Sequence, residues 1–344
     1  MSAAQRVGAA SIVRRVAGWT WALVKWGTVA VLALLACVAI AGRVLHRRDA
    51  QRWHAPGRLV EVEPGRTMHL YCTGAGAPTV VLEAGLGDFS LSSWSSVQPQ
   101  ISAFTRVCSY DRAGTGWSAV PRVAPMPAAI VSDLHVLLGR AGERGPFVLT
   151  GHSLGGPLVR HYAVHYPAEV AGLVLVDGSH EDQITRMRGL PGWLDLLFKA
   201  LPAINAMGID RVAGALAVTD TMSAIALART TTSTAMSNTA TLSLALAPFL
   251  AAVKADVRDF GDLPLTALTA STMIVPGKTP AGADSMHREW VKMHQEIAAR
   301  STRGRWMLVE HSTHYIQKDQ PDVVVGAIRD MVLAVRSARP AGPP

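Results

Sequence analysis

The chain has 344 residues and a formal net charge of +8. The charge is confined to one end, because residues 1–60 hold nine Lys or Arg and one acid, whereas the rest of the chain balances 24 basic residues against 24 acidic ones. A nucleic-acid-binding domain needs a basic patch on its folded surface, so this distribution argues against a nucleic-acid partner. The roughly 280 residues after position 60 suit one domain with an insertion.

The first predicted element is an apolar helix over residues 26–42, which are uncharged and rich in Ala, Val and Leu. Its 17 residues are near the lower limit for crossing the hydrocarbon core of a bilayer. Interfacial and basic side chains flank it: Trp19, Trp21, Lys25, Trp26, Arg6, Arg14 and Arg15 before, and Arg43, Arg47, Arg48 and Arg52 after. The sequence therefore predicts a single-pass membrane anchor with its linker over residues 1–57.

The flanks of this segment leave its orientation and processing open. Positive charge is nearly equal on the two sides, so the positive-inside rule does not choose an orientation. Ala39-Ile40-Ala41 resembles a signal-peptide cleavage site, whereas the long region before the apolar run and the arginines after it favour an uncleaved anchor. We expect an anchored domain outside the cytoplasm, with secretion after cleavage as the alternative.

Two strand-like runs end in glycine-rich loops. Residues 79–82 lead into Glu83-Ala84-Gly85-Leu86-Gly87-Asp88, and residues 105–110 lead into Asp111-Arg112-Ala113-Gly114-Thr115-Gly116-Trp117-Ser118. Short apolar runs bounded by such loops are typical of buried strands. The second loop lacks the third glycine of a dinucleotide-binding fingerprint, so no nucleotide cofactor is predicted.

The most specific pattern is Gly151-His152-Ser153-Leu154-Gly155, which lies between an apolar run at 147–150 and a helix-compatible run at 157–166. A serine on a tight turn between a strand and a helix exposes its Oγ. The flanking glycines let the backbone take that turn and let strand and helix pack closely. The N–H of Leu154 then points to where an oxyanion would develop. The pattern predicts a nucleophilic serine.

Residues 180–262 interrupt the alternation of strands and helices. They contain helix-like runs at 192–207 and 211–227, a Ser/Thr/Ala-rich stretch at 230–244, and four large apolar residues, Met207, Met222, Met236 and Phe249. We interpret the segment as a helical cap. Its apolar side chains either contact an apolar acyl or alcohol group or pack the cap on the body.

The chain ends with a strand-like run at 305–309, two histidines, His311 and His314, and an apolar helix at 323–335 that opens after Gln320-Pro321. His314 lies 161 residues after Ser153. A nucleophile needs a general base, and histidine is the usual one near neutral pH.

The G-x-S-x-G pattern, the D-x-x-G-x-G-x-S pattern at 111–118 and the histidine loop, in this order, resemble the α/β-hydrolase superfamily over about residues 58–335. Its esterase and lipase members are the most similar. The resemblance implies an α/β fold with a mostly parallel central sheet, helices on both faces and a helical cap. The corresponding segments are a core at 58–179, the cap at 180–262, a second core part at 263–338 and a disordered tail at 339–344.

The resemblance also implies a role for each site residue. Ser153 is the nucleophile and His314 the base, with His311 as the fallback. The oxyanion hole consists of the N–H groups of Leu154 and Leu86, Gly87 being the second choice for the latter.

Two aspartates are candidates for the triad acid. Asp177 ends the strand-like run at 172–176, 24 residues after Ser153. Asp284 lies 30 residues before His314, after a strand at 265–270 or 272–275 and a Pro/Gly-rich loop at 276–280. We favour Asp177 and keep Asp284 as the alternative. The acid holds the imidazole in the productive tautomer and stabilises the imidazolium.

The implied function is hydrolysis of carboxylic esters of apolar substrates through an acyl-enzyme on Ser153. The alternatives are an acyltransferase that uses the same residues and a catalytically silent binding protein. No cofactor is needed, and the absence of H-E-x-x-H and C-x-x-C patterns gives no support for a metal site. The expected partners are a small apolar ester or acyl substrate and the membrane, and the oligomeric state is left open.

The cysteines add one prediction. Cys72 and Cys108 lie in strands that are neighbours in the family's strand order, so the resemblance implies a disulfide if the domain is exported, or two reduced core cysteines if it is not. The third cysteine, Cys37, lies inside the apolar segment.

Overall fold

A computed structural model describes residues 3–187, 193–256, 258–273 and 280–338. One eight-stranded sheet runs through the domain in the order β1-β2-β4-β3-β5-β6-β7-β8. The strands are β1 (Arg58–Glu63), β2 (Arg66–Thr73), β3 (Val80–Glu83), β4 (Val107–Tyr110), β5 (Phe147–His152), β6 (Val170–Val176), β7 (Leu265–Ala270) and β8 (Gly304–Val309).

The sheet is parallel from β4 to β8, and only the pairs β1–β2 and β2–β4 are antiparallel. Every residue of β3, β4 and β5 is buried. Strands buried on both faces are expected when helices cover both sides of a parallel sheet. Cys72 and Cys108 are opposite each other in the β2–β4 register and form a disulfide, while Cys37 is free and exposed.

Side chains of β5 alternate between the two faces of the sheet and show how the layers form. Phe147 and Leu149 pack in one core cluster with residues of α4 and α5, whereas Val148 packs in the other with residues of α3 and α14. The helices outside the cap are α2 (Ser90–Trp94), α3 (Gln98–Ser102), α4 (Pro127–Ala141), α5 (Gly155–His165), η1 (Pro167–Glu169), α12 (Pro280–Ala299), α13 (Ile316–Asp319) and α14 (Pro321–Ala338). The predicted architecture, helices on both faces of a mostly parallel sheet, is confirmed.

The helical insertion between β6 and β7 consists of α6 (Gln183–Arg186), α7 (Trp193–Ala206), α8 (Ile209–Ala215), α9 (Thr221–Thr230), α10 (Ser233–Leu244) and α11 (Leu246–Ala255). The helix-like run expected at 211–227 is broken into α8 and α9. Asp220 causes the break, because its side chain accepts the backbone N–H of Ser223 at 2.7 Å and caps α9. Thr232 caps α10 in the same way through Ala235.

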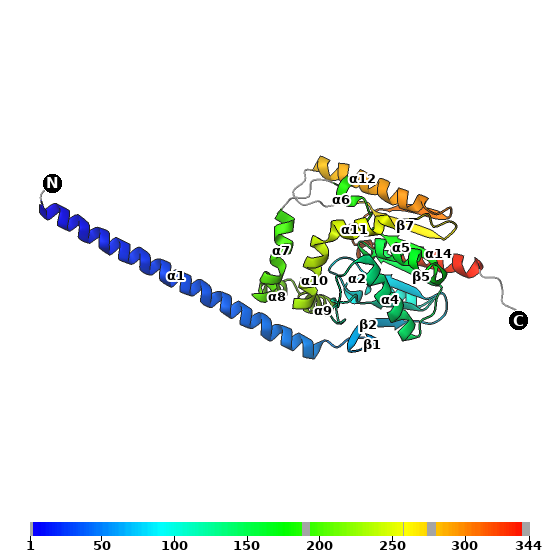
Figure 1. Ribbon diagram of the computed structural model, residues 1–344, viewed down its shortest axis with the longest axis horizontal. Helices are drawn as coiled ribbons and strands as arrows, with labels where there is room; N and C mark the ends of the chain where they lie inside the picture. Colours follow the sequence, from blue (N-terminus) through cyan, green and yellow to red (C-terminus); the bar gives the residue numbers. More distant parts are fainter. Residues whose placement is uncertain (1–2, 188–192, 257, 274–279, 339–344) are drawn as a thin grey trace.

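The N-terminal helix α1 (Ala3–Arg52) projects from the domain (Figure 1). From Gly18 to Arg52 it is the one single helix, among the described residues, that is long and apolar enough to cross a membrane. The C-terminal part of α1 contacts the cap. A Cβ on Gly42 would lie 2.7 Å from the Gly208 Cα, and Asp49 pairs with Arg211 at 2.6 Å. The helix is thus docked on the cap rather than tethered by a loose linker.

Some sequence predictions fall outside the described residues. These are the tail at 339–344, the loop at 276–279, residues 274 and 275 of the alternative strand, and Gly192 at the start of a predicted helix. The other strand alternative, 265–270, is observed as β7.

Candidate active site

Ser153 occupies the turn between β5 and α5 with a backbone φ of +51°, in the left-handed region that non-glycine residues rarely adopt. The neighbouring glycines are required by space. A Cβ on Gly151 would lie 2.4 Å from the Gly155 carbonyl oxygen, and a Cβ on Gly155 would lie 2.6 Å from that of Glu83. The spacing of the G-x-S-x-G pattern therefore follows from how closely β5, α5 and the end of β3 approach one another.

His314, in the loop after β8, is held by Asp177, which directly follows β6. The Nδ1 of His314 donates to Asp177 Oδ2 at 2.7 Å. The other carboxylate oxygen, Oδ1, accepts the Ala270 N–H at 3.0 Å and the Trp290 Nε1–H at 2.9 Å. The imidazole is thereby fixed in the orientation that leaves Nε2 available.

Burial of Asp177 disfavours its charge, yet the hydrogen bond from His314, the nearby charge of His294 and the Ala270 N–H outweigh burial and lower the pKa of Asp177 to about 2. The carboxylate is ionised at neutral pH. An ionised acid beside an imidazole N–H stabilises the imidazolium that forms when the ring takes up a proton.

The two other sequence candidates lie elsewhere. Asp284 is exposed on α12 and makes no hydrogen bond or ion pair to His314. His311 is exposed, and its carbonyl oxygen accepts from Gln320 Nε2 at 3.2 Å. The structure brings Asp177, not Asp284, to His314.

His152 is a site residue that the sequence did not indicate. Its buried ring packs against those of His314 and Tyr315, with centroid distances of 4.8 and 5.0 Å, and its Nε2–H donates to the His314 carbonyl at 2.9 Å. Burial and the adjacent charge of His314 lower the pKa of His152 to about 3, so the ring stays neutral. Its position, just before the nucleophile, was the only available signal.

The loop after β3 runs against the elbow. A Cβ on Gly85 would lie 2.9 Å from His152 Nδ1 and 3.3 Å from the Ser153 Cβ. In the part of the chain that the structure describes, the N–H groups of Leu86 and Leu154 donate to no protein acceptor. Two unused N–H groups beside the serine match what an oxyanion hole needs.

Arg112 supports this loop from the core. Its buried guanidinium donates to the Ala84 carbonyl at 2.6 Å, to the Gly85 carbonyl and to the Glu83 carboxylate. Asp111 accepts the N–H groups of Ser90 and Trp117 at 2.8 and 3.0 Å and thus fixes the neighbouring turns. Neither side chain is placed to react.

The reacting atoms themselves are unengaged. Among the described residues, neither the Ser153 hydroxyl nor Nε2 of His314 makes a hydrogen bond. In enzymes without substrate the nucleophile–base hydrogen bond is commonly long and tightens when substrate binds. The absence of this bond in a structure without substrate is therefore compatible with a nucleophile–base pair.

The cap covers this site through α10. A Cβ on Gly87 would lie 3.3 Å from the side chain of Thr239. A separate cavity of about 380 Å³ lies between α4, β4 and α10, lined by Arg112, Ile130 and Leu242 among others, and neither Ser153 nor His314 is among its lining residues. Of the four large apolar cap residues, Phe249 is fully buried in the core cluster around α5, so it packs the cap on the body.

Part of the chain is similar in sequence to known proteins. Residues 78–206 match the α/β-hydrolase fold family. A putative carbamate hydrolase, RutD, of Klebsiella pneumoniae is 36% identical over 103 residues, which cover 30% of this chain and 38% of RutD. The chain spans less than two thirds of the length of several curated relatives. It covers 36% of an uncharacterised protein of Schizosaccharomyces pombe and 60% of one of Bacillus subtilis.

Solved structures share the fold across most of the chain. An esterase from Thermogutta terrifontis is 20% identical, with a TM-score of 0.55, and the superposition covers 80% of this chain and 97% of the esterase. A putative acyltransferase from Salmonella enterica is 18% identical, with coverages of 82% and 97% and a TM-score of 0.61. With the family match over residues 78–206 and the elbow between β5 and α5, these findings show that the chain has the α/β-hydrolase fold.

Proposed function

We propose that this protein is a serine hydrolase that cleaves carboxylic esters of apolar substrates through an acyl-enzyme on Ser153. The observation that carries the proposal is the 2.7 Å hydrogen bond from His314 to the ionised Asp177, next to a serine on a strained, glycine-flanked turn. A buried carboxylate, an oriented imidazole and a hydroxyl on a partly buried serine are present here, and acyl transfer needs these three groups.

The reaction follows from these positions. His314 Nε2 takes the Ser153 proton as Oγ attacks the ester carbonyl carbon, and the N–H groups of Leu86 and Leu154 bind the oxyanion. One such donor typically contributes about 2.7–4 kcal/mol to lowering the barrier. The imidazolium then gives its proton to the leaving alcohol. Water, deprotonated by the same nitrogen, releases the acid in a second cycle.

Support for an apolar substrate comes from the residues that carry the two proposed oxyanion donors. Leu154 belongs to a buried apolar cluster, and the partly buried Leu86 packs against the same cluster. Small-molecule sites usually combine apolar surroundings with a few placed polar groups. Two of the similar proteins are named an esterase and a putative carbamate hydrolase, and esters and carbamates are both acyl compounds.

For the location we propose that α1 is an uncleaved membrane anchor and that the catalytic domain lies outside the cytoplasm. An 18-residue window within the helix from Gly18 to Arg52 has a mean hydropathy of 2.4 and is almost unburied. The Cys72–Cys108 disulfide fits an oxidising compartment. Cleavage after Ala41 would remove Val38 and Ala39, which contact Gly208 of the cap.

A fluorophosphonate probe tests the proposed chemistry. We expect the full-length wild-type protein to be labelled and to hydrolyse short aryl esters, and Ser153→Ala and His314→Ala to do neither while keeping their melting temperatures. Ser337→Ala, an exposed serine on α14, is the matched control and should behave as wild type. Labelling that persists in Ser153→Ala would contradict the proposal. Acyl transfer to added alcohols in preference to water would redirect it to an acyltransferase.

A further inference from the structure

A cluster of three metal-ligating side chains lies on the far half of the elbow helix, away from the reacting groups. His161 and His165 are one turn apart on α5 and so share a face, and Asp256 directly follows α11. The cluster therefore joins the core helix that carries the nucleophile at its start to the last helix of the cap.

The distances between the possible ligand atoms are close to those around a bound metal ion. Asp256 Oδ2 lies 3.2 Å from His165 Nε2 and 3.7 Å from His161 Nδ1, and the three ligand atoms are all within 4.8 Å of one another. Ligand atoms on a tetrahedral zinc ion, with bonds of about 2.0–2.2 Å, are about 3.3–3.6 Å apart. The observed separations bracket this range.

His161 gives a second, independent indication. Its side chain is 2% exposed, and neither ring nitrogen has a hydrogen-bond partner among the described residues. Buried polar atoms nearly always have a partner, so an unpartnered buried imidazole is unusual.

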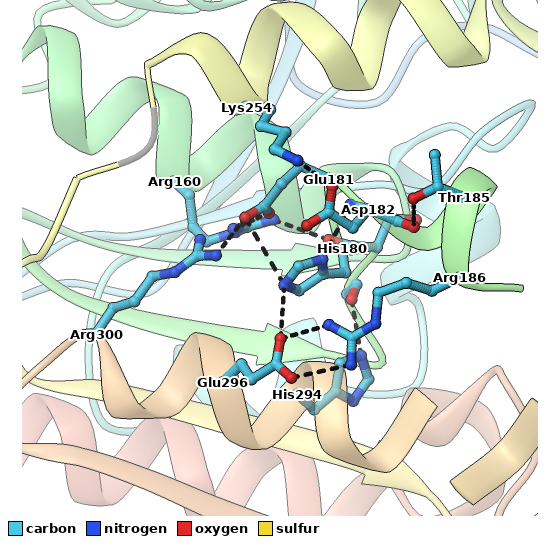
Figure 2. A network of polar contacts seen from close by, with 12 residues as sticks. Arg160, His180, Glu181, Asp182, Thr185, Arg186, Lys254, His294, Glu296 and Arg300 are labelled. Carbon is cyan, nitrogen blue, oxygen red and sulfur yellow. Dashed lines mark hydrogen bonds and ion pairs between the residues drawn. The ribbon is translucent and has the colours of Figure 1, made fainter. Parts of the chain in front are cut away.

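Three arginines, Arg160, Arg258 and Arg300, line the same small cavity as His161 and Asp256. Two of them pair with the buried Glu181, Arg160 at 2.9 Å. Figure 2 shows Arg160 and Arg300 converging on Glu181, beside His180 and Glu296. Glu181 therefore offsets part of the positive charge near the cluster.

We propose that His161, His165 and Asp256 form a binding site for Zn²⁺, with water at the fourth position. His165 and Asp256 are partly exposed, which provides an entry path. Two imidazoles and a carboxylate are ligands that zinc accepts. The ion would fasten the end of the cap to α5 and take no part in the Ser153 reaction.

Zinc titration of the full-length, untagged, metal-stripped protein tests the site. We expect one equivalent bound by calorimetry and, at 100 times the dissociation constant, a melting temperature higher by roughly 5 °C. His161→Ala, His165→Gln and Asp256→Asn should each weaken binding at least tenfold. His54→Ala, an exposed histidine on the linker, should not.

The variants distinguish the proposed site from zinc bound elsewhere on the surface. Because His165 and Asp256 are partly exposed, their variants should fold, which circular dichroism of the metal-free forms verifies. Binding that is equally strong in all the variants would assign the zinc to other surface groups and overturn the proposal, as would no stoichiometric binding by the wild type.

A separate observation carries a second inference, which rests on the proposed anchor. The turn between α7 and α8 touches the apolar part of α1: a Cβ on Gly208 would lie 3.0 Å from the Val38 carbonyl oxygen and 3.5 Å from the Ala39 Cα. Both residues belong to the apolar segment 26–42. This edge of the cap therefore lies level with the end of the span.

The same edge exposes large apolar side chains. On α7, Trp193 is 53% and Leu196 68% exposed, and Leu216, just after α8, is 90% exposed. Figure 1 shows α7 and α8 on the side of the domain from which α1 projects. An apolar helix face at this level is typical of a segment that lies in the membrane interface.

We infer that α7 and the residues after α8 rest on the lipid bilayer, so that the cap has a second membrane contact besides the anchor. An apolar substrate would then reach the cap from the membrane. The occupant of the apolar face is lipid, which follows from its continuity with the anchor.

Fluorophore labels tell the anchor and the cap contact apart. In the Cys37→Ala chain, Leu32→Cys, Leu196→Cys and Leu333→Cys each receive an environment-sensitive dye, since Cys72 and Cys108 are joined. In phosphatidylcholine–phosphatidylglycerol vesicles with nitroxide lipids, we expect quenching at positions 32 and 196 and none at 333, an exposed leucine on α14. Quenching at 32 without 196 overturns this inference and leaves the anchor. No quenching at 32 overturns both.

Discussion

The acid end of the active site and the cap are held in different ways. Asp177 receives hydrogen bonds from three elements, through Ala270 of β7, Trp290 of α12 and His314 after β8, and all of them converge on a buried carboxylate. The cap meets the catalytic loops mainly through α10 and is fastened to α1 by the Asp49–Arg211 pair. The proposed acid and base are thus fixed by several buried hydrogen bonds, whereas the part of the cap beside α1 is held by an ion pair.

We expect the largest effect from a variant that disturbs the buried hydrogen bond between Asp177 and His314. Asp177→Asn keeps the shape of the side chain but favours the wrong imidazole tautomer, so kcat for ester hydrolysis should fall about 10⁴-fold. Asp284→Asn is the matched control and should leave kcat unchanged, because Asp284 is exposed on α12. Steady-state kinetics on both variants checks this, and loss of activity in Asp284→Asn alone would reverse the assignment of the acid.

A smaller effect should follow from loosening the oxyanion loop. Arg112→Met removes the donors to the carbonyl oxygens of Ala84 and Gly85, and we expect kcat to fall about 10²–10³-fold. It also leaves the buried Glu83 unpaired, which should lower the free energy of unfolding by about 3–5 kcal/mol.

The double variant Arg112→Met with Glu83→Gln separates these two effects. Neutralising residue 83 should restore part of the stability, measured by urea unfolding, without restoring kcat. Recovery of both together would mean that Arg112 acts on the reaction only through stability.

On the cap side, Asp49→Asn should loosen structure without stopping chemistry. It leaves the nearly buried Arg211 without its carboxylate, at a local cost of about 1–3 kcal/mol. We expect faster hydrogen exchange in α8 and α9 and a change in kcat below about threefold. Asp195→Asn, at an exposed position of α7, is the control. A large loss of kcat would show that the anchor contact reaches the reacting groups.

The smallest effect is the dependence of stability on pH, which we expect only under acid conditions. The pKa of Asp177 is lowered in the folded protein to about 2, whereas an aspartate in an unfolded chain titrates near 3.9. The resulting stabilisation, on the order of 2 kcal/mol, is complete above about pH 4 and is lost as the pH falls toward 2. Asp177→Asn should lack this part of the acid dependence when unfolding is followed from pH 5 to 2.

The parts of the site that are local in sequence could be predicted. The elbow is a case in point, because the clash distances at Gly151 and Gly155 arise from residues a few positions apart or from the strand beside them. The base could be placed by the strand and proline around it. The fold followed from the order of these patterns.

The parts that depend on distant segments could not be decided in advance. Asp177 and His314 are 137 residues apart, and only the neighbouring positions of β6, β7 and β8 bring the right aspartate to the ring. The division into α8 and α9 depends on a cap at Asp220 that the periodicity of the apolar residues hides. The docking of Gly42 on Gly208 leaves no pattern in either segment.

His152 has a consequence for anyone who wishes to alter the enzyme. Its ring connects the turn that carries Ser153 to the backbone carbonyl of His314. The size of this side chain therefore helps to set the distance between Ser153 Oγ and His314 Nε2, although His152 itself takes no part in the proposed reaction. Position 152 is thus a spacer. A set of variants that differ there alone would sample a graded series of nucleophile–base separations on one scaffold, with every reacting atom retained.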